Sequence, residues 1–150
     1  MNQQKQDLIS QTSELYTMIG YPPIAGKIIA LFYISDEKYL TFEEIMETLK
    51  ISKSATSKAL KFLTDLGEVS FMTKTENSRK RYFYISVKNS LKSLTDWKDS
   101  LDMRKNILEK ALKLRTQKNP DFNTFIQQQI HFIEDISGYI DQKIQQHFIS

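Results

Sequence analysis

The stretch ISKSATSKALKFLTDLG, residues 51–67, has the pattern of a short surface helix. Ser52 stands where a helix N-cap is expected. Thr56, Leu60 and Leu63 recur at helical spacing and predict a buried stripe. The outward side chains are then small or basic: Lys53, Ser54, Ala55, Ser57, Lys58 and Lys61. Such a face suits close approach to a nucleic acid, because Ser and Lys bind base edges and phosphates.

The spacing of the apolar residues changes after this helix from a helical to a strand period. Gly67 is expected to end it, and residues 69–74 alternate apolar and polar side chains. Residues 82–85 are aromatic and β-branched, and the polar segment 75–80 between the two runs predicts the turn of a two-stranded hairpin. Its candidate contacts to a nucleic acid are Lys74, Asn77, Arg79, Lys80 and Arg81.

Three helices are expected upstream. One spans residues 3–19, and a second begins at Pro22-Pro23 and ends near Ser35. Thr41 and Glu44 form a capping box, which predicts a short third helix to Leu49. The order of short helix, brief break, capped helix and hairpin is typical of a winged helix-turn-helix lobe, here over residues 20–88.

Two long helices are expected beyond the hairpin. The first has Leu91, Leu94 and either Trp97 or Lys98 on its apolar side, and ends before Pro120. The last helix has an apolar stripe too long for one small domain to cover, so we expect two chains to bury it together. The candidate dimer residues are Leu8, Leu15, Phe122, Ile126, Ile133, Ile136, Ile140, Ile144 and Phe148.

The expected fold class is mainly α with a small antiparallel β wing. Residues 1–19 and 89–150 form the helical dimerisation region, continuous with the lobe in one structural domain. The chain has 150 residues, no Cys and a net charge of +3. Residues 50–82 alone contain eight basic and three acidic side chains, a net charge of +5 that suits a polyanion partner.

Two features of the sequence bear on whether the protein enters or crosses a membrane. The longest unbroken apolar run, residues 28–34, is far shorter than the roughly 20 residues that span a bilayer. The polar start, residues 1–7, lacks the apolar core of a signal peptide. We therefore expect a soluble cytoplasmic protein that does not bind membranes.

Residues for catalysis or metal binding are few. His131 and His147 have no carboxylates at metal-ligand spacing, and no nucleotide-binding or nucleophile-elbow motif occurs. The pair Glu43-Glu44 is explained by helix capping. We expect no enzymatic activity, no metal and no cofactor.

Residues 20–85 resemble the MarR superfamily of bacterial transcription regulators, in particular its GbsR-like branch. The resemblance rests on the order and spacing of several short pieces: Gly20, Gly26-Lys27-Ile28, Leu40-Thr41-Phe42-Glu43-Glu44-Ile45, Ile51-Ser52-Lys53-Ser54, Leu66-Gly67-Glu68-Val69 and Ser78-Arg79-Lys80-Arg81-Tyr82-Phe83. It implies that Arg79 contacts DNA from the wing, and that the terminal helices form a homodimer. The family commonly braces this arginine with an Asp two residues earlier, where this chain has Asn77.

The resemblance also implies a small-molecule effector, of choline type in the GbsR-like branch. Trp97, Tyr16, Tyr21, Tyr33 and Tyr139 are candidates for an aromatic cage, although aromatic residues at helical spacing are more often core. The identity of any effector stays open.

The function expected from these features is a homodimeric, sequence-specific DNA-binding regulator, a repressor, on a pseudo-palindromic double-stranded site. A winged helix that binds another protein is the alternative, because one fold serves both purposes. The concentration of Lys and Arg on one face favours DNA over a protein partner, whose docking face would be richer in exposed aromatic residues.

Overall fold

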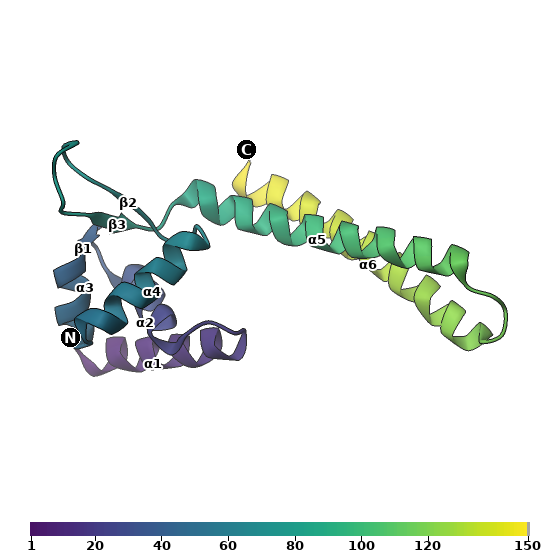
Figure 1. Ribbon diagram of the computed structural model, residues 1–150, viewed down its shortest axis with the longest axis horizontal. Helices are drawn as coiled ribbons and strands as arrows, with labels where there is room; N and C mark the ends of the chain where they lie inside the picture. Colours follow the sequence, from purple (N-terminus) through teal and green to yellow (C-terminus); the bar gives the residue numbers. More distant parts are fainter. Residues whose placement is uncertain (150) are drawn as a thin grey trace. The chain divides into compact units, whose positions relative to one another are not determined.

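The computed structural model describes residues 1–149, which form six helices and a three-stranded sheet (Figure 1). The chain divides into two compact units. Unit 1 spans Met1–Ser90, and unit 2 begins at Leu91. Within residues 1–149, no helix combines the length and the apolar character that a membrane span requires.

Unit 1 begins with two helices packed closely together, α1 (Gln3–Met18) and α2 (Pro23–Ile34). Gly26 allows the close approach, since a Cβ there would lie 2.9 Å from the Cα of Ser13. The Ser13 hydroxyl donates a hydrogen bond to the Pro23 carbonyl oxygen at 2.8 Å across the same contact. Helix α1 therefore lies in the same compact unit as α2, and its predicted part in a dimerisation region stays a prediction.

The next two helices begin at the predicted caps. In front of α3 (Phe42–Leu49), the Glu44 N–H donates to the Thr41 hydroxyl, and the Thr41 N–H donates to the Glu44 carboxylate at 2.7 Å. In front of α4 (Lys53–Asp65), the Ser52 hydroxyl accepts from the Ala55 N–H at 3.2 Å. The tight turn between these helices places Lys50 in the left-handed region, with φ of 52°.

The sheet has one strand more than the predicted hairpin. Strands β2 (Ser70–Met72) and β3 (Tyr82–Tyr84) pair antiparallel, and β1 (Leu40–Thr41) pairs with the other edge of β3. The strand order is β1-β3-β2, with Phe83 opposite both Leu40 and Phe71. We refer to β2, β3 and the connecting residues 73–81 as the wing.

The core of unit 1 lies between the helices and the sheet. It contains side chains from α2, α3 and α4 together with Leu40 of β1, Val69 and Phe83 of β3. Its buried members are Ala25, Ile28, Ile29, Leu31, Leu40, Ile45, Ala59, Leu60, Leu63, Val69 and Phe83. Fixing Phe83 in this core anchors the base of the wing to the helices.

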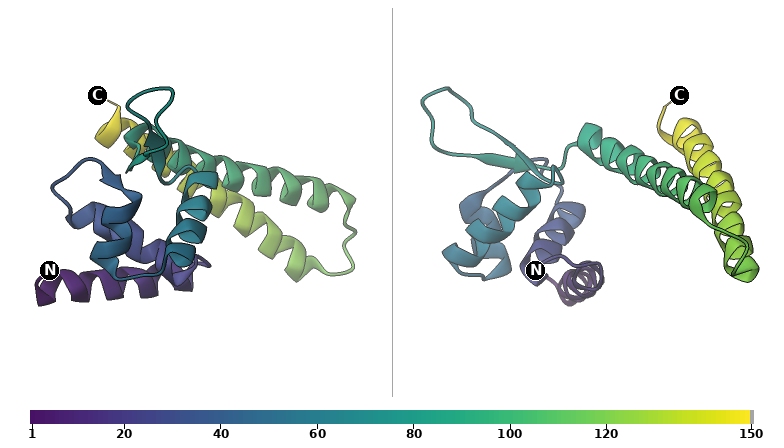
Figure 2. Two further views of the ribbon diagram at one scale, coloured as in Figure 1. Left: turned by 60° about the vertical axis from the view of Figure 1, so that its left-hand side comes forward. Right: turned by 45° about the vertical axis from the view of Figure 1, so that its right-hand side comes forward.

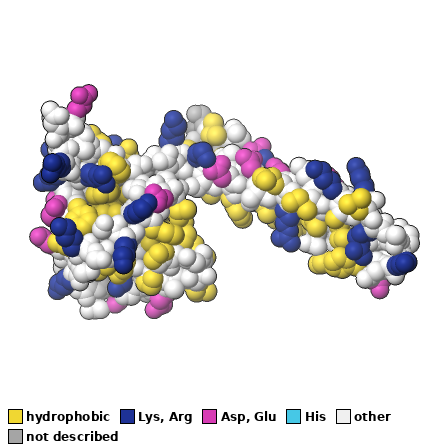
Figure 3. Space-filling model, viewed as in Figure 1, with side chains coloured by type: hydrophobic (Ala, Val, Ile, Leu, Met, Phe, Trp, Pro, Cys, Tyr) yellow, Lys and Arg dark blue, Asp and Glu magenta, His cyan; other side chains and the backbone are white. Residues whose placement is uncertain are grey.

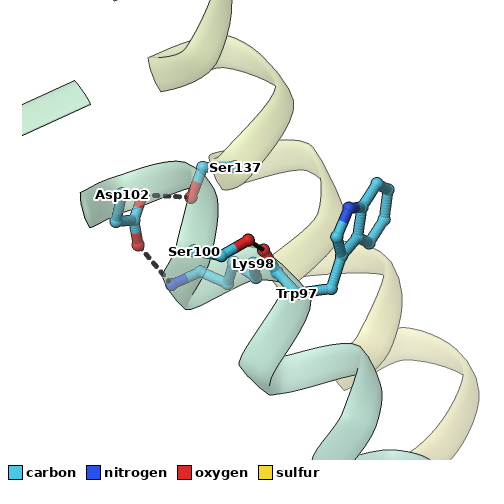
Figure 4. A network of polar contacts seen from close by, with 5 residues as sticks. All are labelled: Trp97, Lys98, Ser100, Asp102 and Ser137. Carbon is cyan, nitrogen blue, oxygen red and sulfur yellow. Dashed lines mark hydrogen bonds and ion pairs between the residues drawn. The ribbon is translucent and has the colours of Figure 1, made fainter. Parts of the chain in front are cut away.

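Unit 2 is an antiparallel helical hairpin of α5 (Val87–Leu114), which begins in unit 1, and α6 (Pro120–Phe148) (Figure 2). Polar contacts fix its register: the Ser137 hydroxyl donates to the Asp102 carboxylate at 2.6 Å, and Lys105 pairs with Glu134 at 3.2 Å. Asp102 also accepts from Lys98 at 3.1 Å (Figure 4). Donation from Ser137 and then from Lys98 lowers the pKa of Asp102.

Figure 4 also shows Trp97 on the other side of α5 from this network. Trp97 is 54% exposed, whereas the Lys98 side chain is only 21% exposed. Of the two residues that the sequence offers for the apolar side of α5, the structure places Lys98 inward. Asp102 makes this possible because it provides the ammonium group with a charged partner.

The long apolar stripe of α6 is divided between an inner and an outer face. Ile126, Ile133 and Ile144 of the predicted dimer residues are buried within the chain itself. The others are half-buried or exposed: Ile136, Ile140, Phe122, Phe148, Leu8 and Leu15. Of the predicted dimer residues, only these six remain partly or largely accessible in the single chain.

Candidate nucleic-acid interface

Helix α4 separates an inward apolar face from an outward polar face. Thr56, Leu60 and Leu63 are buried as the spacing predicts, and Ala59 joins them. The Thr56 hydroxyl donates to the Ser52 carbonyl oxygen at 2.8 Å, so its burial leaves no polar atom unsatisfied. Five of the six proposed contacts are exposed and Ala55 is half-buried; the exposed ones are Lys53, Ser54, Ser57, Lys58 and Lys61.

The wing presents all five of its proposed contacts to solvent: Lys74, Asn77, Arg79, Lys80 and Arg81. Its tip is a turn in which the Ser78 N–H donates to the Thr75 carbonyl oxygen at 3.1 Å. The ammonium groups of Lys74 and Lys80 lie 4.8 and 5.9 Å from the centre of the Tyr82 ring. The wing therefore carries its positive charge on a framework that is partly ordered by aromatic contacts.

A groove of about 530 Å³ brings α4 and the wing together. We call it the basic groove. Its lining residues come from the start of α3, from α4 and from the wing: Phe42, Glu43, Lys53, Ser57, Arg79, Lys80, Arg81 and Phe83. Four are cationic and one is anionic, so the groove favours an anionic ligand. Figure 3 shows Lys and Arg side chains gathered over this part of unit 1.

A second groove of about 410 Å³ adjoins the first, since Ser57 and Arg81 line both. Lys61 lines this neighbouring groove, but its ammonium group pairs with the Asp65 carboxylate at 2.7 Å. Both side chains are more than 60% exposed, so the pair adds little stability and only partly offsets the charge of Lys61. Lys58 lies outside both grooves, on the exposed side of α4.

The contact expected to brace the wing arginine is missing. No hydrogen bond joins the side chains of Asn77 and Arg79 in the part of the chain that the structure describes. Of the two wing arginines, Arg81 is the one with an aromatic partner, because its guanidinium carbon lies 4.3 Å from the centre of the Phe71 ring. Phe71 was not among the predicted residues, although strand alternation places it on the same face as Phe83 and Arg81.

Two of the tyrosines considered for an aromatic cage, Tyr16 and Tyr21, belong to a packed cluster, whereas Tyr33 and Tyr139 are exposed. The rings of Tyr16 and Tyr21 are 5.0 Å apart, and Phe62 lies 5.2 Å from Tyr21. The Tyr21 hydroxyl donates to the Glu68 carboxylate at 2.7 Å. Burial and this hydrogen bond raise the pKa of Tyr21 to about 12, so the hydroxyl stays protonated at neutral pH. These rings support the ends of α1 and α4 rather than line an open site.

Residues 1–149 contain no cluster of three or more His, Asp or Glu side chains that could hold a metal ion. His131 lies 3.5 Å from the Glu134 carboxylate on the surface of α6.

Residues 26–70, which contain α2 from Gly26 onward together with α3 and α4, match the family model described as bacterial regulatory protein, arsR family. The match covers under a third of the chain. No curated protein matches the sequence significantly.

Solved structures show similarity over a longer range. One is described as the crystal structure of a transcriptional regulator; it has a TM-score of 0.71 at 11% identity, over 96% of this chain and 97% of the other. A MarR transcriptional regulator from Methanosarcina mazei Go1 has 22% identity over 87% of each chain and a TM-score of 0.42. The adhesin competence repressor AdcR from Streptococcus pyogenes has 19% identity, coverage of 91% and 98%, and a TM-score of 0.41.

The predicted fold class is thus confirmed: the chain is mainly helical with a small antiparallel sheet. It has a winged helix-turn-helix fold, shared over nearly its whole length with a protein described as a transcriptional regulator, and its helix-turn-helix segment matches the ArsR-family model.

Proposed function

We propose that this chain is a homodimeric, sequence-specific DNA-binding transcriptional regulator, a cytoplasmic repressor of the MarR superfamily and its GbsR-like branch, without enzymatic activity. The observation that supports the proposal best is the basic groove, where α4 and the wing bring Lys53, Arg79, Lys80 and Arg81 together. Phosphates are the ligands that such a surface attracts, because each neutralised phosphate releases counterions.

In the proposed complex α4 lies in the major groove of double-stranded DNA. Lys53, Ser54 and Ser57 come from its first turns, which are the part of a recognition helix that reaches base edges. The wing lies on the adjacent backbone or in the minor groove, where Arg and Lys are favoured. Ala55 and the two serines are small enough for the helix backbone to approach the bases closely.

The proposed dimer uses the outer side chains of unit 2, with α1 as a further element of the dimerisation region. The large apolar residues of the hairpin that remain exposed include Trp97, Met103, Ile107, Leu114, Phe125, Phe132 and Tyr139. Covering them would bury roughly 100 Å² each, or roughly 1,400 Å² for two chains, which lies within the range of stable interfaces. A two-fold dimer would bring two α4 helices to half-sites about 34 Å apart on a pseudo-palindromic site.

The first test is a titration of a fluorescent duplex pool with the purified protein, from low to physiological salt, with light scattering on the same sample. We expect a species of twice the 17.6 kDa monomer mass whose affinity falls steeply as salt rises. A monomer without affinity for duplex DNA at low salt would refute the proposal.

Single substitutions then locate the binding surface. Lys58→Ala and Arg79→Ala each remove one exposed positive charge of the proposed surface, and we expect the salt dependence of binding to decrease by about one counterion for each phosphate that is no longer neutralised. Lys110→Ala, which removes an exposed Lys from α5 in unit 2, is the matched control and should leave binding unchanged. Unchanged affinity in both test variants would contradict this placement.

The alternative, a winged helix that docks on a protein, has one observation in its favour. Phe71 and Met72 of β2 are each 42% exposed, and Phe71 lines the neighbouring groove. The Arg81 guanidinium lies against the Phe71 ring, however, and the groove next to it is lined by four cationic side chains, which favours an anionic partner. Failure to bind duplex DNA combined with an intact fold would favour this alternative. Control by a small-molecule effector stays a prediction.

A further inference from the structure

Arg81, like Lys74 and Lys80, lies against an aromatic ring, but its ring is in contact with a buried core residue. Its guanidinium carbon lies 4.3 Å from the centre of the Phe71 ring, which is close enough for stacking. Phe71 pairs directly with Phe83 across the two strands, and the two rings are 5.8 Å apart. Phe83 is 3% exposed and belongs to the core. The position of this guanidinium is therefore connected to the core through two aromatic rings.

The sheet explains why these three side chains meet. Arg81 precedes Phe83 by two residues and thus lies on the same face of β3 or its extension. Phe71 is opposite Phe83, so Arg81 is its diagonal neighbour, a spacing that long and aromatic side chains can cover. The register of β2 and β3, continued by one residue to Arg81, therefore accounts for the contact.

Arg81 also has a central place in the surface. It lines both the basic groove and the neighbouring groove, and Ser57 of α4 does the same. Among residues 1–149, Arg81 forms no ion pair, whereas Lys61 of the neighbouring groove is paired with Asp65. Arg81 thus offers an uncompensated charge between α4 and the wing.

We propose that Arg81 is a preset phosphate clamp which fixes the depth and register of α4 on DNA, and that Phe71 is the positioning residue which holds the clamp ready. The proposal rests on the proposed function and adds to it the role of one arginine and its aromatic support. With one face of the guanidinium against the ring, its N–H edges remain free to donate two parallel hydrogen bonds to one phosphate. Restricting the side chain before binding also reduces the entropy lost on binding.

The clamp is tested by a double-mutant cycle on the full chain. The variants are Arg81→Lys, which keeps the charge but removes the planar fork, Phe71→Leu, which removes the ring, and the two combined. Phe71→Tyr retains the ring and is the matched control. The probe is a duplex selected by the wild-type protein from a random pool, with fluorescence anisotropy at one fixed salt concentration and a thermal melt of each variant.

We expect Arg81→Lys and Phe71→Leu each to weaken binding by about tenfold, and Phe71→Tyr to bind within about twofold of the wild type. The combined variant should bind the duplex no more weakly than the single variant with the lower affinity, because both changes disable the same clamp. Additive losses, or wild-type affinity of Arg81→Lys, would overturn the proposal. If Phe71→Leu does not fold, the affinities of Arg81→Lys and Phe71→Tyr still test the proposal. Wild-type affinity of Arg81→Lys, or a large loss of affinity in Phe71→Tyr, would contradict it.

The failure of this inference differs from failure of the proposed function. If the wild type binds duplex DNA and Lys58→Ala weakens this binding, but the losses in the double-mutant cycle are additive, only the inference about Arg81 and Phe71 is wrong. If the wild type binds no duplex at low salt, the proposed function is wrong and the clamp with it.

Discussion

Gly26 lies at the closest approach of α1 and α2, and we expect Gly26→Ala to destabilise unit 1. The new Cβ would lie 2.9 Å from the Ser13 Cα and 3.1 Å from the Tyr16 Cβ. Alanine favours a helix over glycine by about 1 kcal/mol. Forcing extra volume between packed backbones costs about 1–3 kcal/mol. Separating the helices also strains the Ser13 hydrogen bond to Pro23, worth about 1 kcal/mol. The free energy of unfolding should fall by about 1–3 kcal/mol in total.

Urea unfolding followed by far-UV circular dichroism measures this change, and the chain contains its own control. Gly138 lies on the exposed side of α6, where an added Cβ would have no neighbour within 4 Å. Gly138→Ala should therefore benefit from the higher helix propensity of alanine without any steric cost, and should stabilise α6 by about 0.5–1 kcal/mol. The reasoning is refuted if Gly26→Ala proves as stable as the wild type, because the short distance to the Ser13 backbone would then have no energetic consequence.

Three further predictions concern caps, pH and the hairpin. Thr41→Ala removes the hydroxyl that caps α3 and should lower the free energy of unfolding by about 1 kcal/mol in urea titrations; an unchanged midpoint would argue against the capping box. Donation from the Thr41 N–H lowers the pKa of Glu44, so its stabilisation is complete above the ordinary value of 4.5 and is lost as pH falls below it; the difference in Tm between wild type and Glu44→Gln should shrink with acidification rather than stay constant. Asp102→Ala leaves the buried Ser137 hydroxyl without its acceptor and should destabilise the hairpin by about 1–3 kcal/mol, seen in the unfolding transition of Trp97 fluorescence.

Helix boundaries were predictable where a local signal defines them. The Thr41–Glu44 capping box and the Ser52 cap are confirmed by hydrogen bonds, because caps depend only on residues within one turn. Strand β1 was not predictable, since two residues are too few to show a strand period and its pairing with β3 is a long-range contact. The left-handed Lys50 is likewise set by the tight turn between α3 and α4, in a residue type without special preference for it.

The candidate site was predictable on α4 and less so in the wing. On α4 the residues that do not belong to the buried stripe must face outward, and the structure places Thr56, Leu60 and Leu63 inward as their spacing requires. In the wing the family pattern directs attention to Arg79 and Asn77, whose side chains have no mutual hydrogen bond in the described chain. The partner of Arg81 is Phe71, ten residues away, and only the strand register reveals that contact.

The last helix shows most clearly what periodicity leaves undetermined. Its residues at seven-residue spacing, Phe125, Phe132 and Tyr139, are exposed, whereas Ile126 and Ile133 are buried, although the two Phe side chains are as apolar as the two Ile side chains. Both sets stay on one side of a helix, because seven residues make nearly two turns. Pairing with α5 decides which set is internal, and that pairing depends on polar contacts between the helices. The inner isoleucines are therefore covered within one chain, and the proposed dimer would be stabilised by the apolar side chains of the hairpin that remain exposed.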